Sequence, residues 1–151
     1  MFRILLNSVR VPAFVLMAGA CIRLAPRTAV EKPTAVIDRH VFAAEVAKSG
    51  EWAEPRGEKK VFVKGTDAAV FSFLSLKDLE GEHTLAWKWY DPSGRLYRAP
   101  DPIAVGRPGQ LFARYIAWDE IRVFEEKDSG RWTVAIFLDG ALALTAGFEI
   151  R

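Results

Sequence analysis

The sequence predicts an all-β domain in the form of an antiparallel β-sandwich, and three observations lead to that prediction. Short apolar segments are separated by clusters of Gly, Pro, Asp and Ser, at the spacing found in proteins built from strands. The segment His83–Tyr90 alternates as a strand with one buried and one wetter face does. Near the end of the chain, Asp139-Gly140 is the two-residue signal of a type I′ hairpin. After residue 50 no segment keeps an apolar stripe at helical spacing.

The first twenty residues have the pattern of a secretory signal peptide. Arg3 and Arg10 precede an uncharged apolar run from Val11 to Ala20, and this stretch holds no acidic residue. The run is about half the length needed to cross a hydrocarbon core as a helix, and Pro12 would disturb such a helix. We therefore expect residues 1–20 to be cleaved rather than to span the bilayer.

Cys21 follows this run in a setting that resembles the bacterial lipobox, where small residues precede a cysteine that is lipid-modified and becomes the new N-terminus. The family usually has Leu where this chain has Ala18. Since Cys21 is the only cysteine, it has no partner for an internal disulfide, and lipidation accounts for it. The alternative is an incidental cysteine in an ordinary signal peptide, cleaved after Ala18 or Ala20. Because Ile22 follows the cysteine, the resemblance implies an outer-membrane protein facing the periplasm in a Gram-negative source.

Charge and composition limit the classes of partner that we expect for this protein. The chain has 21 Lys and Arg residues against 19 Asp and Glu residues, so removal of Arg3 and Arg10 would leave 19 of each sign. The mature protein is thus close to neutral. It also lacks a basic stripe with interleaved aromatic residues, and we expect no nucleic-acid partner. Residues 21–34 carry two prolines and no sustained period, which predicts a flexible tether between the lipid and a single domain over residues 35–151.

Strands are expected at residues 36–46, 61–63, 68–76, 83–90, 96–105 with an interruption at the prolines, 111–124, 132–138 and 142–150. The polar stretch 49–60 is expected to lie outside them. Within residues 83–90, Leu85, Trp87 and Trp89 share the face that we expect to be buried. The sequence Asp91-Pro92-Ser93-Gly94 has the preferences of a type I turn. We expect Trp132 to pack against Trp87.

Two motifs, W-x-W-Y-D-P-x-G-x-L-Y at 87–97 and G-x-W-x-V-x-I-x-L-D-G at 130–140, together with the closing sequence at 148–150, resemble bacterial immunoglobulin-like extracytoplasmic domains. The resemblance covers residues 61–151 and implies a single immunoglobulin-like antiparallel β-sandwich. It implies that Trp87 is the core tryptophan of that sandwich. The disulfide that often accompanies this tryptophan is absent, so no antibody-type kinship follows. Such domains typically serve adhesion, assembly or ligand binding.

No catalytic or metal-binding constellation stands out, and we expect neither a cofactor nor catalysis. The two histidines, His40 and His83, lie far apart and have no further ligand at metal-binding spacing. The chain has no G-x-S-x-G elbow, and Ser72 has no visible base partner. A glycosidase pair of carboxylates stays open because such a pair forms in space. A calcium site built from the scattered aspartates also stays open, with turn formation as the simpler reading.

Trp52 and Trp118 are the candidate binding residues. Trp52 lies in the polar stretch 49–60, and Trp118 precedes Asp119-Glu120. One reading makes these two tryptophans exposed platforms for a sugar or a partner protein. The other makes Trp52 a cover on the end of the sandwich and Trp118 a core residue, and we favour that structural reading.

The combined expectation is a non-catalytic envelope lipoprotein, anchored to the membrane by lipid on Cys21, whose β-sandwich binds another envelope protein, with an uncovered sheet edge as one route. The alternative is a module that binds glycans or small ligands through exposed aromatic residues, and an enzyme ranks third. A glycan module should expose coplanar aromatic rings, an assembly subunit should expose an uncovered strand or apolar patch, and an enzyme needs a cleft with perturbed titratable groups.

Overall fold

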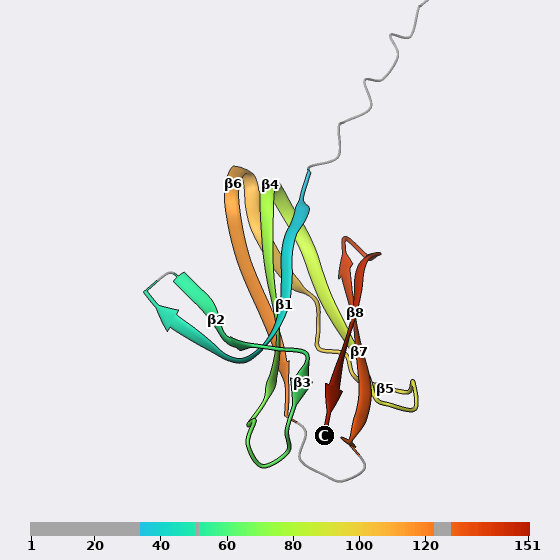
Figure 1. Cartoon of the computed structure of the whole chain (residues 1–151). Helices are drawn as coiled ribbons and strands as arrows, with labels where there is room; N and C mark the ends of the chain where they lie inside the picture. The colour runs from blue at the N-terminus through green and yellow to red at the C-terminus, as the bar shows by residue number, and fades with distance from the viewer. Residues whose placement is uncertain (1–33, 51, 123–127) are drawn as a thin grey trace, which may run out of the picture. The chain divides into compact units, whose positions relative to one another are not determined.

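Strands make up most of the part of the chain that the computed structural model describes, namely residues 34–50, 52–122 and 128–151. They are β1 (Val36–Ser49), β2 (Trp52–Glu58), β3 (Val61–Phe62), β4 (Val70–Tyr90), β5 (Leu96–Arg98), β6 (Ile103–Ile121), β7 (Gly130–Leu138) and β8 (Ala141–Ile150), as Figure 1 shows. In these ranges there is no helix with the length and apolarity needed to cross a bilayer. The expected signal peptide, Cys21 and nearly all of the expected tether lie outside the described residues.

Two layers arise because the long strand β4 changes neighbours along its length. Its first part, Val70–Lys77, pairs with β1 on one side and β6 on the other, and β1 pairs onward with β2. Its second part, Leu85–Tyr90, pairs with β7, which is followed by β8 and β3. The predicted all-β fold is confirmed. All pairings are antiparallel except the short parallel pairing of β3 with β8.

The core lies between the two layers and is rich in aromatic rings. Phe42 of β1 and Phe148 of β8 bring their ring centroids to 4.8 Å of each other. The Trp87 indole N–H donates to the Ser72 hydroxyl over 3.1 Å. Apolar burial and this hydrogen bond across the layers hold the two halves of β4 face to face.

One expectation fails at the bend of β4, since the strands expected at 68–76 and 83–90 are a single strand. Asp78 and Gly81 have positive φ angles of 51° and 84°, and the pairing with β6 shifts register between Glu80 and Glu82. Asp and Gly usually mark turns, but here they mark a bulge that bends a continuing strand. On β6, a Cβ at Gly106 would meet the Gly81 carbonyl oxygen, so the close pairing of β6 with the bend of β4 requires glycine.

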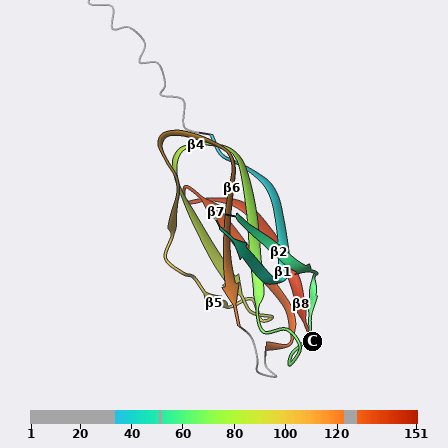
Figure 2. The ribbon, with the colours of Figure 1, turned by 90° about the vertical axis from the view of Figure 1, so that its left-hand side faces the viewer.

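The polar stretch 49–60 was expected to lie outside the strands, and it forms β2 instead. This strand pairs with β1 from Ser49↔Trp52 to Ala43↔Glu58, and within the described strands β1 is its only partner. An edge strand tolerates Pro55 because one row of its backbone N–H groups needs no partner. Figure 1 shows this β1–β2 hairpin projecting from the sheet on the side where β6 lies, and Figure 2 views the molecule from that side.

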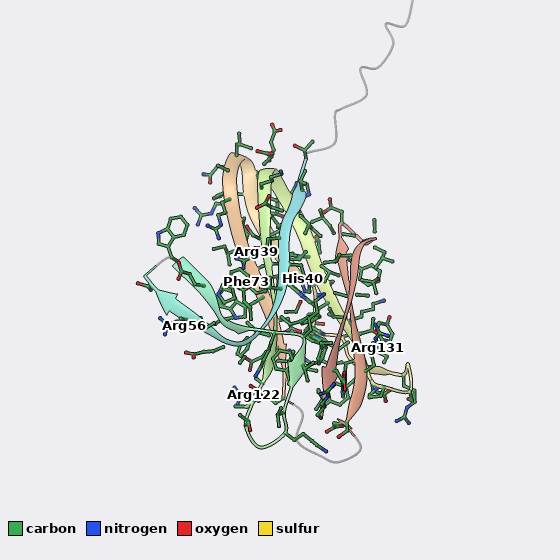
Figure 3. The ribbon with its side chains drawn as sticks, in the orientation of Figure 1. Arg39, His40, Arg56, Phe73, Arg122 and Arg131 are labelled. Atoms are coloured by element: carbon green, nitrogen blue, oxygen red, sulfur yellow. The ribbon has the colours of Figure 1, made fainter. Side chains whose placement is uncertain are left out.

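The β1–β2 hairpin covers the face of the first layer that points away from the core. Side chains alternate between the two faces of β4, so Phe73 points away from the core, to the face opposite its neighbours Ser72 and Leu74. Phe73 is nevertheless fully buried. Figure 3 shows Phe73 on the side of the layer where the hairpin lies. Phe73 is therefore buried outside the main core cluster.

The predicted C-terminal hairpin is confirmed, with Asp139 and Gly140 at φ 52° and 77° between β7 and β8. Trp132 is fully buried, as expected. Its neighbouring rings are Tyr97 at 4.9 Å and Phe148 at 6.2 Å, whereas we expected Trp87. The difference arises because Trp132 lies near the start of β7, level with the end of β4, where β5 supplies Tyr97 as a cover.

Candidate partner-binding groove

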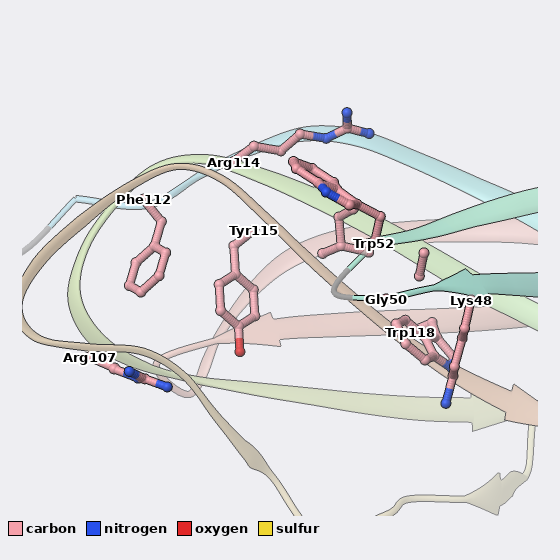
Figure 4. A pocket seen from close by; sticks show the side chains of 10 residues that line it. Lys48, Gly50, Trp52, Arg107, Phe112, Arg114, Tyr115 and Trp118 are labelled. Atoms are coloured by element: carbon pink, nitrogen blue, oxygen red, sulfur yellow. The ribbon is translucent and has the colours of Figure 1, made fainter.

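The fold brings the two candidate tryptophans together at one hollow. Trp52 begins β2 and is 62% exposed, while Trp118 lies on β6 and is half-buried. Both line a depression of about 520 Å³ between the tip of the β1–β2 hairpin and β6, drawn in Figure 4. We call this depression the hairpin groove. Sequence reasoning favoured a structural role for both residues, but the exposure of Trp52 fits the platform reading.

The other aromatic residues of the hairpin groove are Phe112 and Tyr115, also from β6. Their rings stand perpendicular to each other, with centroids 5.7 Å apart and an interplanar angle of 87°. The Lys48 ammonium lies 5.0 Å from the centre of the Trp118 ring, which is cation–π geometry. The aromatic residues thus form an uneven wall instead of a flat platform.

The charged residues of the hairpin groove are all basic. Lys48, Arg107 and Arg114 are exposed and line the hollow, and no acidic side chain lines it among the described residues. Several basic side chains elsewhere are paired, among them Arg39 with Glu58, Lys59 with Asp67 and Arg98 with Asp119. The hairpin groove therefore concentrates positive charge that the described fold leaves available for a partner.

Strand β6 gives the hairpin groove an open sheet edge. Among the described strands β6 pairs only with β4. Phe112 and Tyr115 pack against the main core, whereas Trp118 lies on the opposite face from the buried core residue Ala117. Groove residues therefore lie on both faces of β6, and its unpaired backbone edge runs between them.

Sequence reasoning did not identify Arg107, Phe112, Arg114 and Tyr115 as site residues. The available signal was the segment 111–118, which carries large apolar side chains on both faces and an arginine between them. A buried central strand would not carry that arginine. Only the pairing pattern, however, shows that β6 is an edge and that the hairpin lies beside it.

The fold brings His40 and Ser72 together, a contact the sequence did not reveal. His40 Nε2 lies 2.9 Å from the Ser72 hydroxyl oxygen. Burial, with a smaller contribution from the Lys60 charge, lowers the pKa of His40 to about 4, so the ring is neutral at pH 7. Ser72 is fully buried and already accepts the Trp87 indole N–H. A hydroxyl so enclosed is out of reach of a substrate, and the pair links β1 to the core.

His83 also has a structural role. Its Nδ1 lies 2.8 Å from the Asp139 carboxylate and its Nε2 lies 3.0 Å from the Glu80 carbonyl oxygen. The Thr84 amide donates to the other oxygen of Asp139 over 3.0 Å. These contacts fasten the β7–β8 turn to the bend of β4.

The aspartates considered for calcium serve turns and layer contacts. A hydrogen bond from the Ser93 hydroxyl, helped by the Arg95 and Ser93 amides, holds the pKa of Asp91 below its ordinary value in the predicted turn. Asp119 accepts the Trp89 indole N–H over 2.7 Å and pairs with Arg98. Across residues 34–50, 52–122 and 128–151, no three His, Cys, Asp or Glu side chains gather to form a metal site.

A second hollow, of about 590 Å³, lies between β1 and β8. It contains His40, Lys59 and Arg131 but has little exposed aromatic surface. The Lys59 ammonium is bound to Asp67 over 2.6 Å. This hollow is the open side of the sandwich, and it has fewer features of a recognition site than the hairpin groove.

Comparisons with known proteins find likeness to solved structures, and three of these are described here. A scan of protein-family models and a search of curated proteins find no match. The chain is similar to an alkylpurine DNA glycosylase, AlkC, from Pseudomonas fluorescens bound to DNA with an abasic site analog, at 12% identity and a TM-score of 0.49. The likeness covers 78% of this chain but spans only 30% of the glycosylase.

Two further structures match over most of their own length. An immunoglobulin-like protein from Pseudomonas aeruginosa matches at 16% identity and a TM-score of 0.42, over 78% of this chain and 97% of that one. The CARDB domain of a Pyrococcus furiosus protein, in complex with di-metal ions, matches at 11% identity and a TM-score of 0.37, over 77% and 92%. All three matches are distant, with identities of 11–16% and TM-scores below 0.5.

Proposed function

We propose that this chain is a non-catalytic envelope lipoprotein whose β-sandwich binds another protein at the hairpin groove. The observation that carries the proposal is the exposed Trp52 beside the uncovered strand β6. Buried aromatic and arginine side chains dominate the energy of protein interfaces, and the groove offers both kinds. Lipid on Cys21 would hold the domain near the membrane, and residues 21–34 would serve as its tether.

The shape of the groove favours a protein over a glycan as the main partner. Sugar rings stack on flat, coplanar aromatic faces, whereas Phe112 and Tyr115 are perpendicular and Lys48 lies over the Trp118 ring. A protein surface can match such an uneven wall with side chains of several shapes. A glycan or small ligand remains the second candidate, because the wide exposure of Trp52 alone would suit stacking.

Site-directed crosslinking in cells tests the proposed site. A photo-crosslinking amino acid replaces Trp52 in the full chain, and the matched control carries it at Leu142, which is 60% exposed on β8 and is not among the residues that line the groove. We expect a discrete envelope-protein adduct from position 52 and none of the same mass from position 142. Equal adducts from both positions would contradict a site at the groove. A saccharide adduct alone would favour the second candidate.

The proposed anchor has an independent test. The native protein should have its N-terminus at Cys21 and the added mass of the lipid, measured on the intact molecule. Cys21→Ser should release the protein from membranes. Continued membrane partition of this variant, or a mature N-terminus elsewhere, would refute the anchor. In a Gram-negative source, sedimentation with inner-membrane markers would refute placement in the outer membrane.

A further inference from the structure

We infer that the partner enters as an extended acidic segment that adds a strand to the free edge of β6, beside the hairpin groove. This inference rests on the proposed function and names the chemistry of its partner. Strand addition supplies affinity through backbone hydrogen bonds, and the pockets beside the strand supply specificity through alternate side chains. Three features of β6 and its surroundings support it.

The first feature is the regularity of the open edge. From Leu111 to Ile121, β6 pairs with β4 without a register shift, and this stretch contains neither proline nor glycine. Natural edge strands are usually protected by proline, bulges or short length. In β6 such devices are confined to residues 106–109, where Gly106 and Gly109 have positive φ angles and Pro108 lies between them. The stretch that borders the groove is therefore open to pairing.

The second feature is the sign of the charge. Arg114 lies within the open stretch, and Lys48 and Arg107 lie at the same hollow. The acidic residues near the end of β6 are already engaged, since Asp119 pairs with Arg98 and Glu120 pairs with Arg122. An incoming strand thus meets available positive charge, which selects acidic side chains.

The third feature is the placement of apolar surface. Leu111, at the start of the open stretch, is 69% exposed, and Tyr115 and Trp118 are half-buried on opposite faces of β6. Arg114 and Trp118 share one face of β6, while Tyr115 and Ala117 share the other, so an added strand meets the basic group on one face and apolar groups on the other. The matching sequence alternates acidic and apolar residues.

The binding test uses defined peptides and the full chain in detergent micelles. The probe is a fluorescent, end-capped peptide of alternating Glu and Val, about ten residues long, which is the upper range of ordinary strands. One control peptide alternates Lys and Val. A second keeps the Glu and Val side chains but is N-methylated at alternate residues on the edge that would pair. We expect the probe to bind at least about tenfold more tightly than either control, a difference that charge complementarity and backbone pairing can each supply.

Variants of the protein locate the binding. Arg114→Glu should weaken probe binding by about tenfold, because it reverses a charge at the open edge. The matched control is Arg56→Glu, which changes an exposed arginine on the edge strand β2, outside the residues that line the groove. We expect this control to leave probe binding unchanged. Addition of the probe should also slow amide hydrogen exchange at residues 111–121, a readout that side-chain contact alone would not give.

Each remaining result overturns a defined part of the inference. Equal binding of the N-methylated peptide, with no slowing of amide exchange, would refute strand addition. Equal binding of the Lys peptide would refute selection for acidic segments. Binding of an oligogalacturonate probe in place of the peptide would identify a glycan ligand and refute the inference. A protein crosslinked at position 52 without any peptide binding would leave the proposed function standing and refute only its extension to β6.

Discussion

The two hairpins of this domain differ in where they place a tryptophan: one tryptophan is buried in the core and the other is exposed at the surface. In the β7–β8 hairpin, Trp132 is fully buried and lies beside the rings of Phe148 and Tyr97. In the β1–β2 hairpin, Trp52 is 62% exposed at the edge of a groove. Each hairpin turns at a glycine with positive φ, so the local backbone does not explain the contrast. What differs is whether the hairpin completes the sandwich or extends beyond it.

The comparison teaches that a tryptophan supports stability or recognition according to the position of its strand in the sheet. Strands β7 and β8 lie inside the path of paired strands, between β4 and β3. Strand β2 ends that path with a free edge, and Trp52 at its start is exposed. The four predictions that follow test this difference, from the largest expected effect to the smallest.

Trp132→Ala should lower the free energy of unfolding by about 3–5 kcal/mol, because it removes a large ring from a fully enclosed site and leaves a cavity. That is a large share of the total stability of an ordinary domain, about 5–15 kcal/mol. Urea unfolding followed by circular dichroism measures the loss. A loss as small as that of Trp52→Ala would mean that the β7–β8 hairpin is not part of the core.

The pH dependence of stability tests the part of β1 that precedes its hairpin. Burial lowers the pKa of His40 to about 4, whereas the unfolded residue titrates near 6.5. As the pH falls below 6.5, His40 takes up a proton in the unfolded chain but stays neutral in the folded chain. The free energy of unfolding therefore decreases. Between pH 7.5 and pH 5 the loss from this group is about 2 kcal/mol.

His40→Gln supplies the control, since glutamine keeps a polar partner for Ser72 but does not titrate. Its stability should change less over the same pH interval. Asp67 does not obscure the result: burial acts to raise its pKa, but hydrogen bonds from Lys59 and the Val63 amide outweigh this effect and lower the pKa. Its contribution is therefore lost only below about pH 4. Equal pH dependence in both proteins would show that His40 is not held neutral.

The two turn glycines offer a matched pair. Gly140 and Gly50 have φ angles of 77° and 61°, and a Cβ at either would meet nothing within 4 Å. Valine at either position therefore introduces backbone strain of about 1–2 kcal/mol without a steric clash. Gly140→Val should lower global stability by that amount. Gly50→Val should lower it by less than about 1 kcal/mol, because the tip of an edge hairpin can open locally.

Urea unfolding of the two glycine variants measures this difference. Equal losses would mean that the β1–β2 hairpin unfolds together with the core. Such a result would weaken the distinction between the hairpins without affecting the groove.

Trp52→Ala should have the smallest effect on stability, less than about 1 kcal/mol, because the ring is mostly exposed. It should nevertheless abolish or strongly weaken partner binding, measured by loss of the envelope-protein adduct when the crosslinking residue is placed at Lys48. A large loss of stability would instead make Trp52 a structural cover. Unchanged stability together with unchanged binding would remove it from the site.

The sequence was sufficient wherever local chemistry decides the structure. Asp139-Gly140 forms its hairpin because these residues accept positive φ, and alternation in His83–Tyr90 places Trp87 and Trp89 in the core. The sequence was insufficient where contacts between segments far apart in the chain decide the structure. Strand β2 has no apolar alternation and contains Pro55, and it is a strand because β1 pairs with it.

The groove was only half visible in the sequence for the same reason. Trp52 and Trp118 stood out as residues without an assured place in the core. Their proximity depends on the bend of β1 toward β6, and the alternation of individual strands does not encode it. Gly106 shows the same limit, since its need for glycine comes from the Gly81 carbonyl of another strand.

The domain cannot complete its fold until β3 pairs in parallel with β8. Phe62 is buried against Phe148, and the Glu149 and Arg151 amides donate to the Lys60 and Phe62 carbonyls. These contacts join segments separated by almost the whole described domain, so a long loop must close before they form. As the chain folds, the hairpins of neighbouring strands can form first, while Phe62 stays uncovered until β8 pairs with β3. That interval is when the chain most needs protection from aggregation.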